Sequence, residues 1–481
     1  MKKIYLIIVF ILASVSLSAQ NLRTGYFLDG YSYRYQFNPA LQGDRGFLAI
    51  PIFSRIGVGV ESSIGLRDYL YPTSSGTLAT FLHPEISNDV VMRNLGNRTI
   101  ANTNFDLNVL AFGFRVKKSY HTFDVSLKGN MDITLPGDVF RFMKVGGSDG
   151  NAVYDFSDLS LSSDAYAQVA YGFSRRFLDK FNVGIRLKGL MGIESVRTKI
   201  KDLSLKMDGD QWMVKAEGNA MFSSIPASIA AGEDDITTEQ LMSLVQKPNI
   251  GFAVDLGVSV DLFKYLTLSA SIVDLGLISW NNVATYRLSN EPWIYEGFNL
   301  STDQNVSNNF NEQLDAELNK LGSLFNVEDM TPEMKAKHMQ KLAMTAHVGV
   351  EARLPFYERL SVGILGTHRF NGSHSWTEGR FSLNWALLRW FSLAANYAIS
   401  DLGHSYGAAI NLHPQGFSLF LGTDSFRPVL ALAPGEGFVP LNEINTNVVL
   451  GVNFPFGKYN GRFPKKIKEP KKDKKSKKDK D

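Results

Sequence analysis

Apolar and polar residues alternate along most of the chain with the period of a β-strand. The clearest case runs from Ile250 to Leu262, where every second residue is Ile, Phe, Val or Leu and the residues between are Gly, Ala, Ser or Asp. Successive side chains of a strand point to opposite faces, so Val258 belongs to the apolar face and Asp255 to the polar one. In a strand of this length, confinement of charge to a single face predicts a barrel with an apolar exterior and a polar interior.

Fourteen segments show this alternation strongly. Their connections alternate between short turns and mostly longer polar segments, which is typical of outer-membrane barrels with an even strand number. We therefore predict an all-β fold, a transmembrane antiparallel β-barrel of about fourteen strands over residues 47–456 with long external loops. A soluble β-sandwich with an aromatic core is the alternative. The predicted short turns are Lys117–Ser119, Arg175–Lys180, Phe263–Tyr265, Pro355–Arg359, Arg389–Trp390 and His413–Gly416.

Four longer segments interrupt the alternation and are predicted to be loops at the opposite end. Residues 65–104 and 133–163 are rich in Gly, Pro and Ser. Residues 195–248 contain two possible short strands, near Val196–Ile200 and Trp212–Ala216. In residues 276–340, Phe310, Leu314, Leu318 and Leu321 share one face of a predicted amphipathic helix.

Aromatic residues gather at the predicted short turns. A ring of aromatic side chains at the membrane interface is a property of outer-membrane barrels, so we predict that these residues form the periplasmic girdle. They are Phe177, Phe263, Tyr265, Phe356, Tyr357, Trp390 and Phe391.

The N-terminus has the layout of a secretory signal peptide. Lys2 and Lys3 precede an apolar run from Ile4 to Leu12, and small residues follow up to Ala19. We predict a signal peptide over residues 1–19 with cleavage after Ala19. A membrane-spanning helix is the alternative, but the apolar run is shorter than the roughly 20 residues that a bilayer core requires.

Composition narrows the class of protein further. The 481 residues include no cysteine, which excludes disulfides, thiolate metal sites and a lipidated cysteine after the signal. Aromatic residues make up 12% of the chain and glycine is abundant at 41 residues. This composition suits a barrel in which only every second strand residue faces lipid.

The C-terminal stretch differs from the rest of the chain. Lys465–Asp481 holds ten lysines and four acidic residues, a density of like charge that does not fold. Residues 457–481 are predicted to form a disordered periplasmic tail that contacts an anionic lipid, polymer or protein. A solubilising tail without a specific partner is the alternative. No nucleic-acid partner is predicted.

Catalytic motifs are lacking in the sequence. The eight histidines are scattered and form none of the usual metalloprotease or nucleophile motifs. Asp401, His404 and Ser405 contain the residue types of a catalytic triad, but their ordinary interpretation is solvated turn residues. We predict that the protein is not an enzyme and has no catalytic or cofactor site.

A metal site has equally little support. Asp149, Asn151 and Asp155 lie in a Gly-rich segment that faintly resembles a calcium loop. The segment lacks the spacing and the terminal Glu of such loops. No metal site is therefore predicted, and the sequence leaves the ligand-binding residues unidentified.

Several motifs carry a resemblance to known barrels. They are the signal ending in Ser18-Ala19-Gln20, the Asn38-Pro39-Ala40 motif, the fourteen-strand pattern and the Asp-Leu-Gly hairpins at Leu266–Gly276 and Phe391–Gly403. Together they resemble the superfamily of FadL-type and PorV-type outer-membrane barrels, and most closely a domain family of unknown function within it. Asn38-Pro39-Ala40 with Gly43 also resembles the NPA motif of PorP/SprF-type proteins, which are associated with type IX secretion and gliding.

This resemblance implies a role for the segment before the first strand. FadL-type transporters plug the barrel with that segment, so residues 20–46 are expected to form an N-terminal hatch or a periplasmic segment. No ligand-contacting residue carries over.

Two functions follow from these expectations. The protein is predicted to lie in the outer membrane of a Gram-negative bacterium, in contact with its lipid and with both termini periplasmic. The leading hypothesis is a barrel that binds or transports a hydrophobic or amphipathic small molecule. The other hypothesis is a structural or type IX secretion/gliding-associated barrel that scaffolds periplasmic or surface partners.

Overall fold

The computed structural model describes residues 22–50, 54–147, 151–178, 180–208, 211–224, 248–288, 291–296, 320, 333–426, 430–433, 437–440 and 443–459. The predicted signal peptide and the Lys-rich stretch 465–481 lie outside these residues. So does the predicted amphipathic helix, apart from Lys320.

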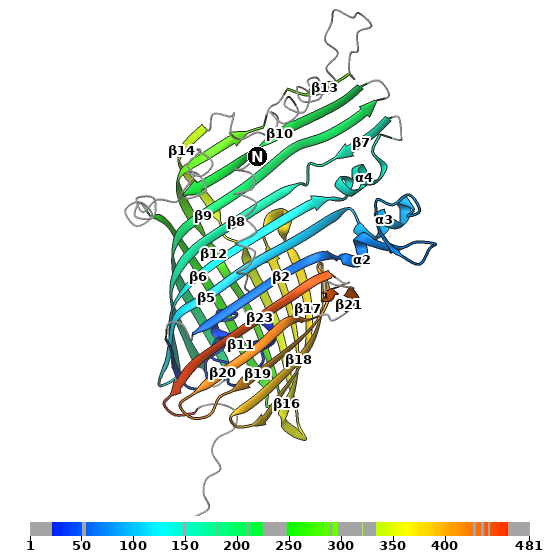
Figure 1. Ribbon diagram of the computed structural model, residues 1–481. Helices are drawn as coiled ribbons and strands as arrows, with labels where there is room; N and C mark the ends of the chain where they lie inside the picture. Colours follow the sequence, from blue (N-terminus) through cyan, green and yellow to red (C-terminus); the bar gives the residue numbers. More distant parts are fainter. Residues whose placement is uncertain are drawn as a thin grey trace, which may run out of the picture.

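Fourteen antiparallel strands close into a barrel, which confirms the predicted fold class (Figure 1). The first strand is divided into β1 and β2, and β23 pairs with both β20 and β2 to close the sheet. In order around the barrel, the strands are β1 (Gly46–Ala49) with β2 (Arg55–Gly65), β5 (Arg98–Val116), β6 (Ser119–Pro136), β8 (Ser160–Phe177), β9 (Phe181–Asp208), β11 (Asn249–Phe263), β12 (Leu266–Arg287), β15 (Met344–Leu354), β16 (Tyr357–Phe370), β17 (Trp376–Leu388), β18 (Phe391–Ser400), β19 (Gly403–Leu412), β20 (Ser418–Phe426) and β23 (Glu443–Phe456).

One side of the barrel is much taller than the other, as Figure 1 shows. β9 has 28 residues, whereas β20 has 9. Four shorter strands extend the tall side beyond the barrel: β7 (Asn151–Asp155), β10 (Gln211–Ser224), β13 (Trp293–Tyr295) and β14 (Glu333–Lys341).

The tall side corrects several loop predictions. The two short strands expected in residues 195–248 are parts of β9 and β10, which pair over most of their length. β6 continues to Pro136, and β12 continues to Arg287. The sequence obscured these extensions because Gly and polar residues are frequent in them, and pairing with a neighbouring strand outweighs the weak β-propensity of such residues.

The segments that connect the strands at the tall end contain the helices. α2 (Leu66–Tyr69), α3 (Asn88–Leu95) and α4 (Gly137–Val145) lie there with the hairpin of β3 (Leu70–Pro72) and β4 (Leu78–Thr80). Phe81, Val91 and Phe140 bury their side chains in one cluster that joins the three helices. No helix among the described residues is long and apolar enough to cross a bilayer. A second small hairpin, β21 (Leu430–Ala433) with β22 (Gly437–Pro440), precedes the last strand.

The two faces of the barrel wall differ as the alternation predicts. On β11, Val258 is 44% exposed and Asp255 is fully buried inside. The exterior carries a long series of exposed apolar side chains, and the interior carries buried Asn, Ser, Asp, Glu and Arg. This is the arrangement of a barrel surrounded by lipid.

Several of the aromatic side chains predicted for the short turns are exposed there. Phe177, Phe263, Phe356 and Trp390 are exposed at the ends of their hairpins. Further along the exterior, His121 stacks on Phe114 with ring centroids 5.0 Å apart. Amphipathic aromatic side chains favour the level of lipid headgroups, so this end of the barrel suits a membrane interface.

A charged residue on the exterior should prevent correct insertion. Val258→Arg is expected to destabilise the inserted barrel by about 2–4 kcal/mol if Val258 lies near the bilayer midplane, because no water solvates the cation there. Val258→Leu keeps the apolar exterior and is the control. The measurement is the fraction of folded protein after refolding into lipid vesicles. Equal yields for both variants would contradict the assignment of the lipid-facing side.

Candidate functional site

Residues 22–45, here called the luminal segment, lie inside the barrel. The segment is irregular apart from two short 3-10 turns, η1 (Arg23–Gly25) and η2 (Arg34–Gln36). Its side chains meet inward-facing residues of strands around the wall, including Phe27 against Gly363 of β16 and Leu22 against Gly422 of β20. All six of its aromatic side chains are buried, with at most 4% of each exposed.

Arg23 joins the luminal segment to three strands of the wall. Its guanidinium lies 2.6 Å from Glu61 Oε1 of β2 and 3.3 Å from Glu378 Oε2 of β17. The backbone N–H groups of Arg23 and Thr24 donate to the carboxylate of Asp424 on β20, at 2.7 and 2.5 Å. Because these charges are all buried, removal of one partner would leave the others uncompensated.

The Asn38-Pro39-Ala40 motif forms a second anchor on the other side of the lumen. Asn38 Nδ2 donates to the carbonyl oxygens of Val258 and Ala270 at 3.1 and 3.2 Å, and Asn38 Oδ1 accepts from the backbone N–H of Ala40 at 2.9 Å. The amide thus bridges β11 and β12 and fixes the turn that follows it.

Two glycines of the wall make room for this motif. Gly184 of β9 and Gly257 of β11 face each other in the sheet register. A Cβ atom at Gly184 would lie 2.2 Å from the carbonyl carbon of Pro39, and one at Gly257 would lie 2.0 Å from Asn38 Oδ1. Only glycine permits this close approach of two backbones.

Eight charged side chains form an electrically balanced network on the wall beside the luminal segment. Arg186 lies 2.6 Å from Asp124 and 3.0 Å from Asp255, measured between nitrogen and oxygen atoms. Lys188 lies 2.5 Å from both Asp255 and Asp274. The other members are Arg55, Asp106 and Lys128, with 2.7 Å between Arg55 Nη2 and Asp106 Oδ2 and with Lys128 directly opposite Asp106 in the sheet.

Tyrosines of the luminal segment cover two of these cations. The guanidinium of Arg55 lies 5.4 Å from the centre of the Tyr33 ring, and that of Arg186 lies 5.6 Å from the centre of the Tyr35 ring. A cation over an aromatic face is attracted by the ring quadrupole, most strongly where water is excluded. The segment is therefore held by the charged network as well as by its two anchors.

Asp274 occupies an unusual backbone conformation within this network. Its φ is +62°, and a bulge lies at this point between β11 and β12. The Asp274 N–H donates to Asp255 Oδ1 at 2.7 Å, which compensates for the interrupted strand pairing. Strained residues of this kind concentrate at functional sites.

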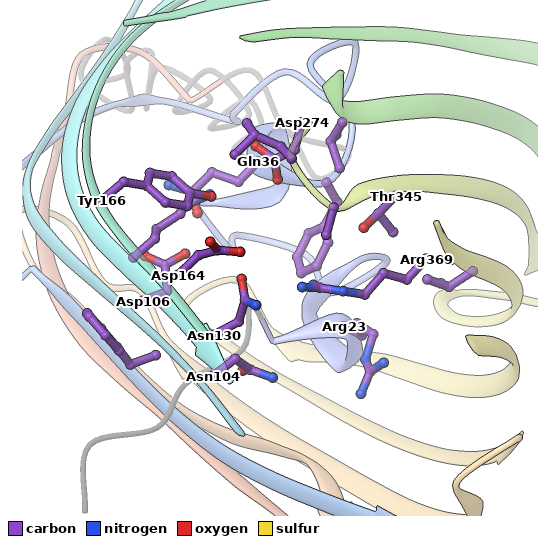
Figure 2. A pocket seen from close by; sticks show the side chains of 18 of the residues that line it. Arg23, Gln36, Asn104, Asp106, Asn130, Asp164, Tyr166, Asp274, Thr345 and Arg369 are labelled. Carbon is purple, nitrogen blue, oxygen red and sulfur yellow. The ribbon is translucent and has the colours of Figure 1, made fainter. Parts of the chain in front are cut away.

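A cavity of about 130 Å³ lies between the luminal segment and the wall (Figure 2). Its lining mixes charged and amide side chains with aromatic ones. Figure 2 shows Asp106, Asp164 and Tyr166 on one side and Arg369 with Thr345 on the other. The lining includes Arg23, Gln36, Phe37, Asn104, Phe105, Asp106, Lys128, Asn130, Asp164, Tyr166, Asp274, Thr345, His347, Arg369 and Trp376.

The carboxylates of the cavity are already paired. Asp164 lies 2.7 Å from Arg197, Asp106 pairs with Arg55, and Asp274 pairs with Lys188. Apolar surface comes from aromatic side chains such as Phe37, Phe105 and Trp376. The cavity therefore suits a small molecule with both polar and apolar parts better than a purely apolar one.

At the short-turn end, the luminal segment rests on the turn that follows β19. The His413 ring contacts Gly30, and a His413 nitrogen lies 3.1 Å from Ser392 Oγ. Burial lowers the pKa of His413 to about 4, despite the nearby carboxylate of Asp29. His413 is therefore neutral at pH 7, as its packed position requires.

The residues of the candidate triad are not brought together. Asp401 accepts the Thr377 N–H at 2.8 Å, and His404 Nδ1 lies 2.8 Å from the Tyr397 hydroxyl. Ser405 is buried on the inner face of β19, whereas His404 is exposed on the outer face.

The candidate calcium loop is only partly described, because Asp149 lies outside the described residues. Asp155 Oδ1 accepts the Ser157 N–H at 2.9 Å. Among the described residues, no group of three or more His, Asp or Glu could hold a metal ion.

Sequence reasoning missed the residues that hold the luminal segment. Arg23 offered a weak signal, because a base in a segment rich in aromatic residues requires a counter-charge if it is buried. Its partners Glu61, Glu378 and Asp424 lie up to 401 residues away, and no local pattern connects them.

These features define a class of protein: a transmembrane β-barrel whose lumen is occupied by its own N-terminal segment. The chain belongs to a family of unknown function, DUF5723, whose model matches residues 39–424. The match agrees with the expected family of unknown function, while its placement in the FadL/PorV superfamily and the likeness of Asn38-Pro39-Ala40 to PorP/SprF-type proteins stay predictions. No curated protein matches the chain.

Several solved outer-membrane barrels are similar to the chain. A Pseudomonas aeruginosa FadL homologue has 11% identity and a TM-score of 0.41, over 92% of this chain and all of the other. The Ralstonia pickettii toluene transporter TbuX has 10% identity and a TM-score of 0.40, over 87% of this chain and 92% of the other. Similarity at this level carries no argument about function, and the fold rests on the strand pairing described above.

The glycine pair at the second anchor is open to a direct test. Gly184→Ala is expected to displace Pro39 and to lower the stability of the barrel by about 1–3 kcal/mol, because the added methyl group has no room. Gly189→Ala on the same strand is the matched control, since its Cβ would meet only Val169 O at 3.9 Å. The measurement is the thermal unfolding midpoint in detergent. Equal midpoints for both variants would contradict the close approach of Pro39 to β9.

Proposed function

We propose that the protein is an outer-membrane barrel that binds a small amphipathic molecule in the luminal cavity. The observation that carries this proposal is the mixed lining of the cavity, which includes Tyr166 and Trp376 as well as Lys128 and Arg369. Binding sites for small molecules combine apolar surface with a few polar groups that fix orientation. The polar part of the ligand would face Arg369 and Asn130, and its apolar part would face Phe105.

In this proposal, the luminal segment acts as a plug. Arg23 and Asn38 hold it on opposite sides of the lumen, so passage of a molecule through the barrel requires at least one anchor to open. Binding without displacement of the segment needs no such step. The geometry therefore supports ligand binding more directly than transport.

A second candidate function is favoured by the filled lumen. A barrel whose interior is occupied by a segment held through buried ion pairs has the properties of a rigid scaffold. Partners would then contact the tall side, the helices α3 and α4, or the Lys-rich tail. The association of such a scaffold with type IX secretion or gliding, the periplasmic position of both termini and an anionic partner of residues 457–481 stay predictions.

Ligand binding is tested by filling the cavity. Thr345→Phe places an aromatic ring in the lining and is expected to reduce a co-purified small molecule at least about fivefold, because the cavity of about 130 Å³ has no room for both. Thr80→Phe, in the exposed β4 hairpin, is the control. Mass spectrometry of solvent extracts from the folded proteins gives the measurement. Equal amounts in both variants, or none in the unmodified protein, would refute binding and favour the scaffold.

The plug is tested by ion conductance in planar bilayers. Arg23→Met combined with Asn38→Ala removes both anchors and is expected to raise the single-channel conductance several-fold, because water and ions fill the vacated lumen. The control is Arg359→Met with Asn88→Ala, which changes the same residue types outside the lumen. If the first variant is folded and conducts no better than the control, the luminal segment is not the barrier.

A further inference from the structure

Basic residues gather on one sector of the short-turn end. Two neighbouring hairpin ends, where β5 turns into β6 and β8 turns into β9, carry five of them, with Arg175 and Arg176 among the last residues of β8. The turns are joined directly, because the Arg176 N–H donates to the Lys118 carbonyl at 3.2 Å. These five residues, here called the basic turn patch, are Lys117, Lys118, Arg175, Arg176 and Lys180.

In the sequence, the two hairpin ends carry five basic residues and one acidic residue, Asp179. Arg176 pairs with Asp261 at 2.7 Å, while Lys117, Arg175 and Lys180 make no ion pair with another described residue. Lys117, Arg175 and Lys180 are all exposed. Such a cluster attracts anions over about 10 Å at 0.1 M salt.

The other four predicted short turns each hold at most one Lys or Arg, namely Lys264, Arg359 and Arg389 in three of them. Lys264, in the turn between β11 and β12, pairs with Glu358 at 2.8 Å. The turn from His413 to Gly416 contains neither Lys nor Arg. The charge is therefore local to one sector rather than distributed around the rim.

Exposed apolar side chains lie beside the cations on the same turns. Val116, Phe177 and Phe181 are 48%, 47% and 44% exposed. Leu178 is 83% exposed and has a φ of +47°, a conformation that bulky residues rarely adopt. The backbone of this turn is therefore strained at Leu178, and the leucine side chain is exposed to its surroundings.

We propose that the basic turn patch binds the phosphate groups of anionic phospholipids in the leaflet around the short-turn end. Lys117, Arg175 and Lys180 would contact the phosphates, while Phe177 and Leu178 would reach the acyl chains below them. Two observations favour lipid over a protein partner. The apolar side chains continue the lipid-facing exterior of β8 and β9, and the cations sit at its edge, where anionic headgroups lie.

Lipid retention by the full-length protein tests this proposal. The unmodified barrel is inserted into vesicles of phosphatidylcholine with one part in five phosphatidylglycerol and then extracted with mild detergent. Mass spectrometry gives the ratio of the two retained lipids. Phosphatidylglycerol is expected to be enriched at least about threefold over the vesicle composition.

The patch variant combines Lys117→Gln, Arg175→Gln and Lys180→Gln. Its ratio of retained phosphatidylglycerol to phosphatidylcholine is expected to fall to the ratio in the vesicles. A salt concentration of 0.5 M is expected to have the same effect on the unmodified protein. The matched control combines Lys264→Gln, Arg359→Gln and Arg389→Gln, which removes the same charge from other turns and keeps the Lys-rich tail. The control is expected to retain the enrichment.

Two outcomes would overturn the proposal. Equal loss of enrichment in both variants would show that total charge, rather than this patch, attracts the lipid. Unchanged enrichment in the patch variant, together with loss of a co-purifying acidic protein, would assign the patch to a protein partner. Heat-dependent mobility in gel electrophoresis verifies that each variant is a folded barrel, so that the comparison is valid.

Discussion

A network of eight charged side chains on the inner wall, six of them buried, constrains the interior of this barrel. A single charge taken from water into the lumen costs several kcal/mol unless a partner neutralises it. Arg55, Lys128, Arg186 and Lys188 are balanced by four aspartates on neighbouring strands, with no excess of either sign. Because the partners come from different strands, the network fixes the register of the wall and the positions of the tyrosines that cover it.

The luminal segment completes this arrangement. Tyr33 and Tyr35 close the network from above, Arg23 brings its own charge to three carboxylates, and Asn38 ties the segment to two backbone carbonyls. The cavity is what remains between these groups, so its mixed polar and aromatic lining follows from how the segment is anchored. The carboxylates of the cavity are already paired with basic side chains and need no counter-charge from a ligand, which favours neutral or amphipathic molecules.

The sequence predicted the barrel because its wall obeys a local rule. The alternation in Ile250–Leu262 follows from the period of the strand. The polarity of each side chain therefore indicates whether it faces lipid or the lumen. Strand extensions such as the end of β9 were missed, since Gly and polar residues there are held by pairing with β10. The contacts of Arg23 were equally inaccessible, because they join residues that only the closed barrel brings together.

The luminal segment has a strand-like alternation but does not form a strand. Tyr31, Tyr33, Tyr35 and Phe37 alternate as in a strand, yet η2 lies within them and the rings pack against the wall and one another. Period two predicts a strand only where a neighbouring strand can pair with the backbone. Inside the lumen, the wall strands already pair with each other. The luminal segment therefore forms turns instead of hydrogen-bonded strand pairs.

The three partners of Arg23 have a consequence for the order of assembly. Arg23 stands near the beginning of the chain, whereas Glu378 and Asp424 belong to the tenth and thirteenth strands of the barrel. The binding site of the luminal segment is thus incomplete until almost the whole wall has folded. Contacts between residues so distant in sequence form late, since the entropy of closing the intervening chain must be overcome first. The luminal segment therefore reaches its final place only as the last strands close the barrel around it.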